Sequence, residues 1–156
     1  MEPWEISYNL NLKPQKPESW DIAMEKYIKE KDEKTLTFIN SSYQYHSFLF
    51  YYNLDYFKDY ENTINRLNED NIIPTNEGSG VLDKFEISKF DKLALFLSHE
   101  TKKDGENTLL TNLQKKYEII EIDENLHGLR YYMFDLIKAK YEENFEIDFE
   151  HEEYRK

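Results

Sequence analysis

The segment 142–153 holds the densest group of side chains that could do chemistry, because seven of its twelve residues are carboxylates. They are Glu142, Glu143, Glu146, Asp148, Glu150, Glu152 and Glu153. Phe145, Ile147 and Phe149 alternate with acidic residues, and this period of two predicts a final strand. Alternate carboxylates of a strand share one face, roughly 6.6 Å apart. Such a row can accept hydrogen bonds from Arg and Lys, or imitate a nucleic-acid backbone. It can also serve only to keep an edge strand from pairing with other chains.

The charge of the whole chain favours a positively charged partner. Asp and Glu number 32 against 20 Lys and Arg, which gives a formal net charge of −12. Residues 117–156 contribute twelve acids and five bases, a net of −7, so more than half of the charge lies in the last forty residues. Charge of this sign repels nucleic acid and attracts a basic protein. We therefore expect a basic protein partner and no direct nucleic-acid binding, although the same charge could serve solubility alone.

Aromatic side chains are the second unusual feature, with 13 Tyr and 10 Phe in the chain. Nine lie between positions 43 and 60: Tyr43, Tyr45, Phe48, Phe50, Tyr51, Tyr52, Tyr56, Phe57 and Tyr60. At 100° per residue they surround a helix almost completely, so this helix either sits in the core or offers one side to a partner. Tyrosine is enriched at interface hot spots. We expect Tyr51, Tyr131 and Tyr141 to contact the partner beside the carboxylates of 142–153.

Motifs for catalysis, metal binding or cofactor binding are missing from the sequence. There is no Cys, and the four histidines stand far apart, without the His-Glu-x-x-His spacing of zinc enzymes. Asp91 with Glu100 and Lys102 only faintly resembles the acidic pattern of metal-dependent nucleases. The four glycines form no phosphate-binding loop. We expect no catalytic residue, no metal, no cofactor, and a protein that is not an enzyme.

The chain also lacks signals for secretion or membrane insertion. Its N-terminus has no basic and apolar leader, and no apolar run approaches the length of a transmembrane helix. A cytoplasmic protein is the prediction. At 156 residues, with no low-complexity linker and no internal repeat, the chain is expected to form one domain over 1–156.

Hydrophobic periodicity predicts the elements that must position these groups. In chain order we expect a strand near 4–12, a helix from Ser19 ending in the solvated charge run 29–34, a long helix or two in tandem over 43–70, a loop over 71–80, a strand over 81–87, helices over 88–102 and 109–113, a strand over 117–123, a helix over 126–142 and a strand over 145–149. This is an α+β fold, a helix-dominated single domain with a small sheet formed by the N-terminal and C-terminal strands.

In size and charge the chain resembles immunity proteins that neutralise nuclease-type toxins, and also phage inhibitors of nucleic-acid-binding defence enzymes. The resemblance is one of composition and rests on no motif, so it assigns no residues. It implies an inhibitor that attracts a basic partner over long range and holds it through buried aromatics and Arg–carboxylate pairs. Two other interpretations stay open: a structural homo-oligomer that buries its surplus aromatic face, and a divergent small enzyme. The oligomeric state is left open.

Overall fold

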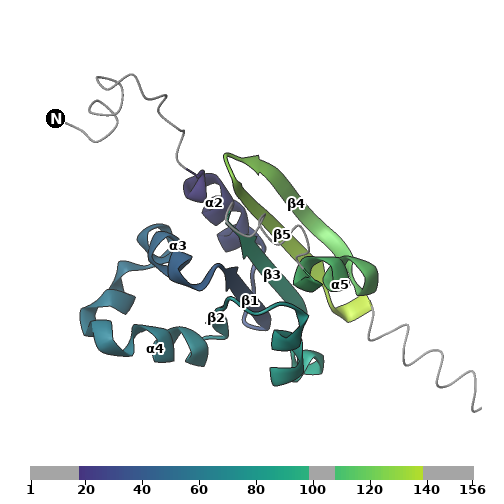
Figure 1. The fold of residues 1–156 in the computed structure, drawn as a ribbon, viewed down its shortest axis with the longest axis horizontal. Coiled ribbons are helices and arrows are strands. Elements are labelled where there is room, and N and C mark those ends of the chain that lie inside the picture. Colours follow the sequence, from purple (N-terminus) through teal and green to yellow (C-terminus); the bar gives the residue numbers. More distant parts are fainter. Residues whose placement is uncertain (1–17, 99–107, 139–156) are drawn as a thin grey trace, which may run out of the picture.

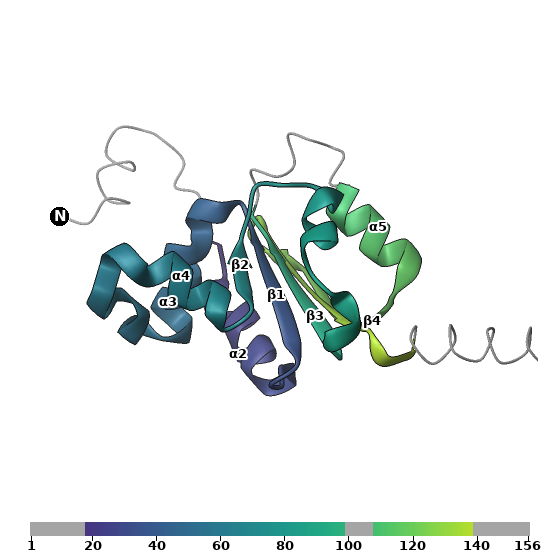
Figure 2. The same ribbon diagram turned by 90° about the horizontal axis from the view of Figure 1, so that it is seen from below.

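A computed structural model describes residues 18–98 and 108–138 as a five-stranded mixed sheet with helices on both faces (Figures 1 and 2). The α-helices are α2 (Trp20–Glu30), α3 (Tyr45–Tyr52), α4 (Thr63–Glu69) and α5 (Thr108–Lys116). Short 3₁₀ helices are η1 (Ser42–Gln44), η2 (Leu54–Asn62), η3 (Ser79–Lys84) and η4 (Ile87–Lys89). The strands are β1 (Thr35–Asn40), β2 (Ile72–Pro74), β3 (Lys92–Leu97), β4 (Glu118–Leu126) and β5 (Leu129–Asp135).

The strand order is β2-β1-β3-β5-β4. Strand β1 runs parallel to both β2 and β3, whereas β5 runs antiparallel to its neighbours β3 and β4. Every residue of β1 is buried, and so are five of the six residues of β3. Strands covered on both faces read as continuous apolar runs rather than as alternating patterns.

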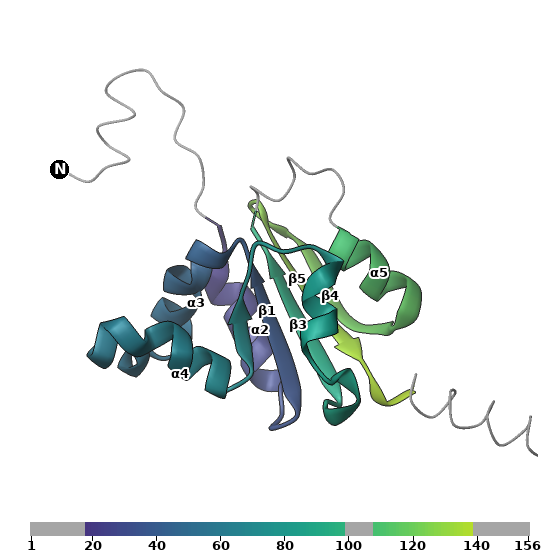
Figure 3. The ribbon, with the colours of Figure 1, turned by 60° about the horizontal axis from the view of Figure 1, so that its bottom comes forward.

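Helices cover both faces of the sheet (Figure 3). Each face has its own hydrophobic core. On one face α2, α3 and α4 cover the sheet, and Trp20, Tyr27 and Phe48 pack against Phe96 of β3. On the other face α5 packs leucines against β3 and β5. The result is three layers, helix on sheet on helix.

The predicted α+β class is confirmed, although helix-dominated describes it loosely. Helices of all kinds account for 52% of the described residues, but the central layer is a five-stranded sheet. This sheet is built from strands between positions 35 and 135. The terminal strands predicted near 4–12 and over 145–149 lie outside the described residues.

Several predicted elements are present. Helices α2 and α5 and strand β4 lie where the periodicity places them. The aromatic stretch forms helices in tandem rather than one long helix, because Asn53 is fully extended (φ −167°) and Asp59 is non-helical. The Asn53 side chain accepts a hydrogen bond from Asp55 N at 2.9 Å, which starts η2 afresh.

Four predicted elements are wrong. Within the described residues, the helices expected over 88–102 and 126–142 are instead the strands β3 and β5. The strand expected over 81–87 consists of the 3₁₀ helices η3 and η4. The loop expected over 71–80 contains the strand β2. Short buried strands rich in Leu, Ala and Met cannot be told from buried helices by periodicity. A signal for β5 was available in the turn before it, where His127 (φ 55°) and Gly128 (φ 100°) form the two-residue connection of a β-hairpin.

Candidate functional site

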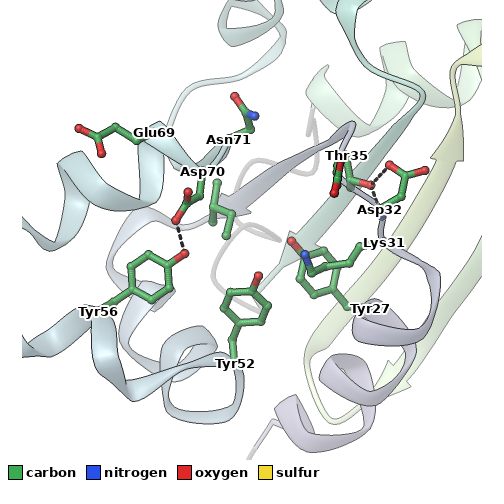
Figure 4. A pocket seen from close by; sticks show the side chains of 11 residues that line it. Tyr27, Lys31, Asp32, Thr35, Tyr52, Tyr56, Glu69, Asp70 and Asn71 are labelled. Carbon is green, nitrogen blue, oxygen red and sulfur yellow. Dashed lines mark hydrogen bonds between the residues drawn. The ribbon is translucent and has the colours of Figure 1, made fainter.

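A cavity of about 390 Å³ opens at the amino-terminal ends of β1 and β2, where three helices finish. We call it the tyrosine cleft, because Tyr27 of α2, Tyr52 of α3 and Tyr56 of η2 line it (Figure 4). Its volume lies within the range of small-ligand sites, roughly 300–1,000 Å³. The remaining polar lining comes from the residues that directly follow α2 and from the end of α4.

The three tyrosines are fixed by packing and by hydrogen bonds. The Tyr27 ring is 2% exposed and contacts the Tyr52 ring, with 5.8 Å between the ring centroids. Its hydroxyl shares a 2.7 Å hydrogen bond with Thr37 Oγ1 in β1. Tyr56 donates its hydroxyl hydrogen to the Asp70 carboxylate. Rings held in this way present pre-oriented faces and hydroxyls to the cavity.

Burial favours the neutral form of the Tyr27 and Tyr56 phenols. It raises the pKa of Tyr27 well above the ordinary value of 10.0, and burial together with the Asp70 carboxylate does the same for Tyr56. A neutral phenol keeps its hydrogen and adds no negative charge to the cleft. The negative charge of the cleft therefore comes from carboxylates alone.

Four carboxylates line the tyrosine cleft: Asp32, Glu33, Glu69 and Asp70. Together with the Lys31 ammonium, which also lines the cavity, they give the lining a formal net charge of −3. The Lys92 ammonium offsets part of this charge, because its nitrogen lies 3.8 Å from Asp32 Oδ2. Asp32 accepts hydrogen bonds from Lys34 N at 2.8 Å and from Thr35 Oγ1 at 3.1 Å. Glu33 and Glu69 are exposed and have no hydrogen-bond or ion-pair partner within the part of the chain that the structure describes.

Helix ends add to this negative potential. Tyr52 is the last residue of α3, Lys31 caps the end of α2, and Asp70 caps the end of α4. The carboxyl end of a helix carries partial negative charge, because its last carbonyls lack partners within the helix. The convergence of three such ends makes the cleft attractive to a cation.

Lys31 already places a cation in the tyrosine cleft. Its ammonium nitrogen lies 5.8 Å from the Tyr27 ring centroid and 5.5 Å from that of Tyr52. In Figure 4 the Lys31 side chain reaches into the space that the three tyrosines border. On the outer side, the Arg66 guanidinium stacks over Tyr56 at 5.2 Å. These contacts have the geometry of cation–π interactions, so the rings of the cleft accept cations.

The predicted partner-contacting tyrosines fall in different places. Tyr51 is 45% exposed and lines a second cavity next to His46 and Phe50, so its ring is accessible, and its contact with a partner stays a prediction. Tyr131 was expected to be accessible, and this is wrong, because it is fully buried in β5 and donates to Glu30 at 3.3 Å. Tyr141 and the carboxylates Glu142, Glu143, Glu146, Asp148, Glu150, Glu152 and Glu153 lie outside the described residues.

Sequence reasoning missed the tyrosine cleft because its parts belong to different elements. The charge run 29–34 was interpreted as a solvated helix end, yet Lys31, Asp32 and Glu33 line a cavity. Tyr52 and Tyr56 lie in the aromatic stretch 43–60, where nothing in the sequence separates them from the other aromatic residues. In the structure Tyr56 belongs to the hydrophobic core and Tyr52 packs against it. A usable signal was the repeated placement of acidic residues at or just after the end of a helix, as in 32–33 and 69–70.

Residues 18–98 and 108–138 contain no group of three or more His, Cys, Asp or Glu side chains arranged to hold a metal ion. Over the same ranges, no helix is both long enough and apolar enough to cross a bilayer. No protein-family model matches this chain, and no curated protein or solved structure matches it either.

Proposed function

We propose that the chain is a non-enzymatic binding protein that captures and neutralises a basic protein, as an immunity protein neutralises a nuclease-type toxin in the cytoplasm. The observation that carries the proposal is the convergence of four carboxylates and three helix ends on a cavity lined by tyrosines. Negative potential gathered in a concave place favours a cationic side chain over other ligands.

The charge of the whole chain supports the same partner class. A net charge of −12 accelerates the approach of a basic protein at low ionic strength. The tyrosine cleft then supplies short-range contacts that slow dissociation, since aromatic pockets and charge-assisted hydrogen bonds act mainly on the off-rate. In this proposal the acidic surface attracts the partner over long range, and the tyrosine cleft holds it in contact.

Affinity capture from an extract of the native host tests this proposal. The immobilised chain should retain a basic protein at low ionic strength and less of it at physiological ionic strength. A cleft variant carrying Glu69→Gln and Asp70→Asn should lose at least about tenfold in affinity. The amide at position 70 still accepts from Tyr56, so the fold is preserved while the charge is removed.

A matched control is available on the opposite face of the sheet. Asp83→Asn with Glu86→Gln removes the same two charges from exposed positions in and beside η3, and should retain the partner as the wild type does. The retained protein, purified, should lose its nuclease or other toxic activity in the presence of the chain. Equal loss in both double variants, or retention of acidic proteins, contradicts the proposal.

The acidic segment 142–153 is a separate contributor in this proposal. Replacing Glu146, Asp148 and Glu150 together with their amides should slow association and flatten its salt dependence, because these charges steer the encounter. An unchanged association rate would show that this segment is not part of the binding surface, and only the tyrosine cleft would then remain as the proposed site.

Exposed apolar side chains favour homo-oligomerisation as a second candidate function. On η1, α3, η2 and α4 these are Tyr43, Phe50, Tyr51, Leu54, Tyr60 and Ile64. An exposed aromatic group of this kind marks an interaction surface. Chromatography with light scattering separates the two candidates, because a stable dimer that a Phe50→Asp substitution dissociates supports assembly.

A further inference from the structure

We propose that the tyrosine cleft is a binding site for a single arginine side chain, which takes the position of the Lys31 ammonium beside the contacting rings of Tyr27 and Tyr52. The inference rests on the proposed function for the source of the arginine, a basic protein, but it concerns a defined site and one residue chemistry. In the unbound chain, the Lys31 ammonium occupies the position that the arginine takes when it binds.

The contacts of Lys31 support a displaceable occupant. Its ammonium lies nearly equidistant from two ring centroids, at 5.5 and 5.8 Å, and no ion pair or hydrogen bond holds it within the described residues. The Lys31 backbone is already fixed by its hydrogen bond to Tyr27 O at 2.8 Å, so the side chain can swing out without moving α2. Displacement therefore costs only the ring contacts and some side-chain entropy.

The lining of the cleft favours guanidinium over ammonium. A lysine from a partner would only exchange one ammonium for another on the same rings. A guanidinium is flat, is less strongly hydrated, and can stack on a ring while its fork donates to a carboxylate. The cleft offers both a ring and carboxylates, since Asp70 and Glu69 line the same cavity as Tyr52. The stacking of Arg66 on Tyr56 shows this ring chemistry within the chain itself.

A nuclear magnetic resonance titration with N-acetyl-arginine amide tests the site without any partner. In the free protein, ring currents from Tyr27 and Tyr52 should shift the Lys31 ε-methylene signals upfield. The probe should return these signals to ordinary positions while it perturbs the Tyr52 ring. N-acetyl-citrulline amide, which has the same shape without the charge, should have no effect, and N-acetyl-lysine amide should bind more weakly. Lys31 signals that stay unchanged at saturation, or equal binding of citrulline, overturn the inference.

Substitution of Lys31 provides a gain-of-affinity test. Lys31→Gln should raise the affinity for the arginine probe about fivefold, because the competitor is gone. Lys29→Gln makes the same charge change at an exposed position of α2 and should have little effect. In the Tyr52→Leu background the gain from Lys31→Gln should vanish, whereas a purely Coulombic effect of Lys31 would persist and contradict displacement. If Tyr52→Leu does not fold, the wild-type titration decides alone.

The outcomes separate this inference from the proposed function. If arginine binds and displaces Lys31, but no basic protein is captured from the host, the arginine site is supported and the proposed function is contradicted. If the chain captures a basic protein but its cleft does not bind the arginine probe, the proposed function is supported and the arginine site is contradicted.

Discussion

Tyrosine hydroxyls in this protein have two distinct roles, and the difference lies in burial. Tyr27, Tyr131 and Tyr132 lie in the interior and each makes a hydrogen bond within the fold. Tyr56 joins the interior to the tyrosine cleft, since its ring is buried and its hydroxyl donates to the cap of α4, Asp70. Tyr51, by contrast, offers its ring to solvent.

Removal of the Tyr56 hydroxyl should destabilise the fold. Tyr56→Phe keeps the buried ring and leaves Asp70 without its donor, which should cost about 1–2 kcal/mol in the free energy of unfolding. Urea denaturation measures the change. Tyr51→Phe is the control and should stay within about 0.5 kcal/mol, because this exposed residue lies outside the core. Equal effects of the two substitutions would show that the hydrogen bond to Asp70 adds nothing.

Buried tyrosines should also make the protein sensitive to alkali. Burial, with the nearby Glu124 carboxylate, raises the pKa of Tyr132 to about 12, compared with 10.0 for an unperturbed phenol. Because the folded state favours the protonated form, the contribution of Tyr132 to stability is complete below pH 10 and is lost as the pH rises from 10 to about 12.

The free energy of unfolding should therefore stay level from neutral pH to roughly pH 9 and fall steeply above pH 10, since Tyr27 and Tyr131 shift in the same direction. Tyrosinate absorbance, recorded together with circular dichroism, should show these phenols ionising only as the fold is lost. Ionisation of all tyrosines near pH 10 in a chain that stays folded would contradict the burial described here.

At the scale of elements, Phe96 of β3 joins the sheet to the helices above it. Its ring contacts those of Trp20, Tyr27, Phe48 and Tyr131, with centroids between 5.1 and 5.6 Å apart. Phe96→Ala should cost about 3–5 kcal/mol, because it leaves a cavity at the point where α2, α3 and β5 meet. Thermal and urea denaturation measure the loss.

The matched control is Phe50→Ala on α3, whose ring is 63% exposed. It should change the free energy of unfolding by no more than about 0.5 kcal/mol. A small effect of Phe96→Ala, similar to that of the control, would contradict the position of β3 in the middle of the sheet.

The elements also show what the sequence could predict. Amphipathic elements such as α2 and β4 are half exposed, and their periodicity identifies them correctly. Strands β1, β3 and β5 are covered on both faces, so burial no longer alternates with exposure and periodicity cannot distinguish them from helices. The tyrosine cleft joins residues from six elements, α2, β1, α3, η2, α4 and β2. The pairing of β1 with β2 and the contact between the Tyr27 and Tyr52 rings bring them together, and neither can be read from local periodicity.

At the scale of the whole molecule, charge and shape act at different distances. The net charge of −12 acts over the Debye length, about 8 Å at physiological ionic strength, and under the proposed function it attracts the basic partner before contact. The tyrosine cleft acts only in contact, through the rings and carboxylates that line it. Salt should therefore change the association rate much more than the dissociation rate.

Site-specific photo-crosslinking in native host cells tests the central claim most directly. A photoreactive amino acid placed at Glu69, at the edge of the tyrosine cleft, should form one dominant adduct with a basic protein, and added Asp70→Asn should weaken this adduct. The same amino acid at Asp83, on the opposite face of the sheet, should not form it. If Glu69 gives no adduct, gives an acidic protein, or gives the same adducts as Asp83, the tyrosine cleft is not the binding site for a basic partner.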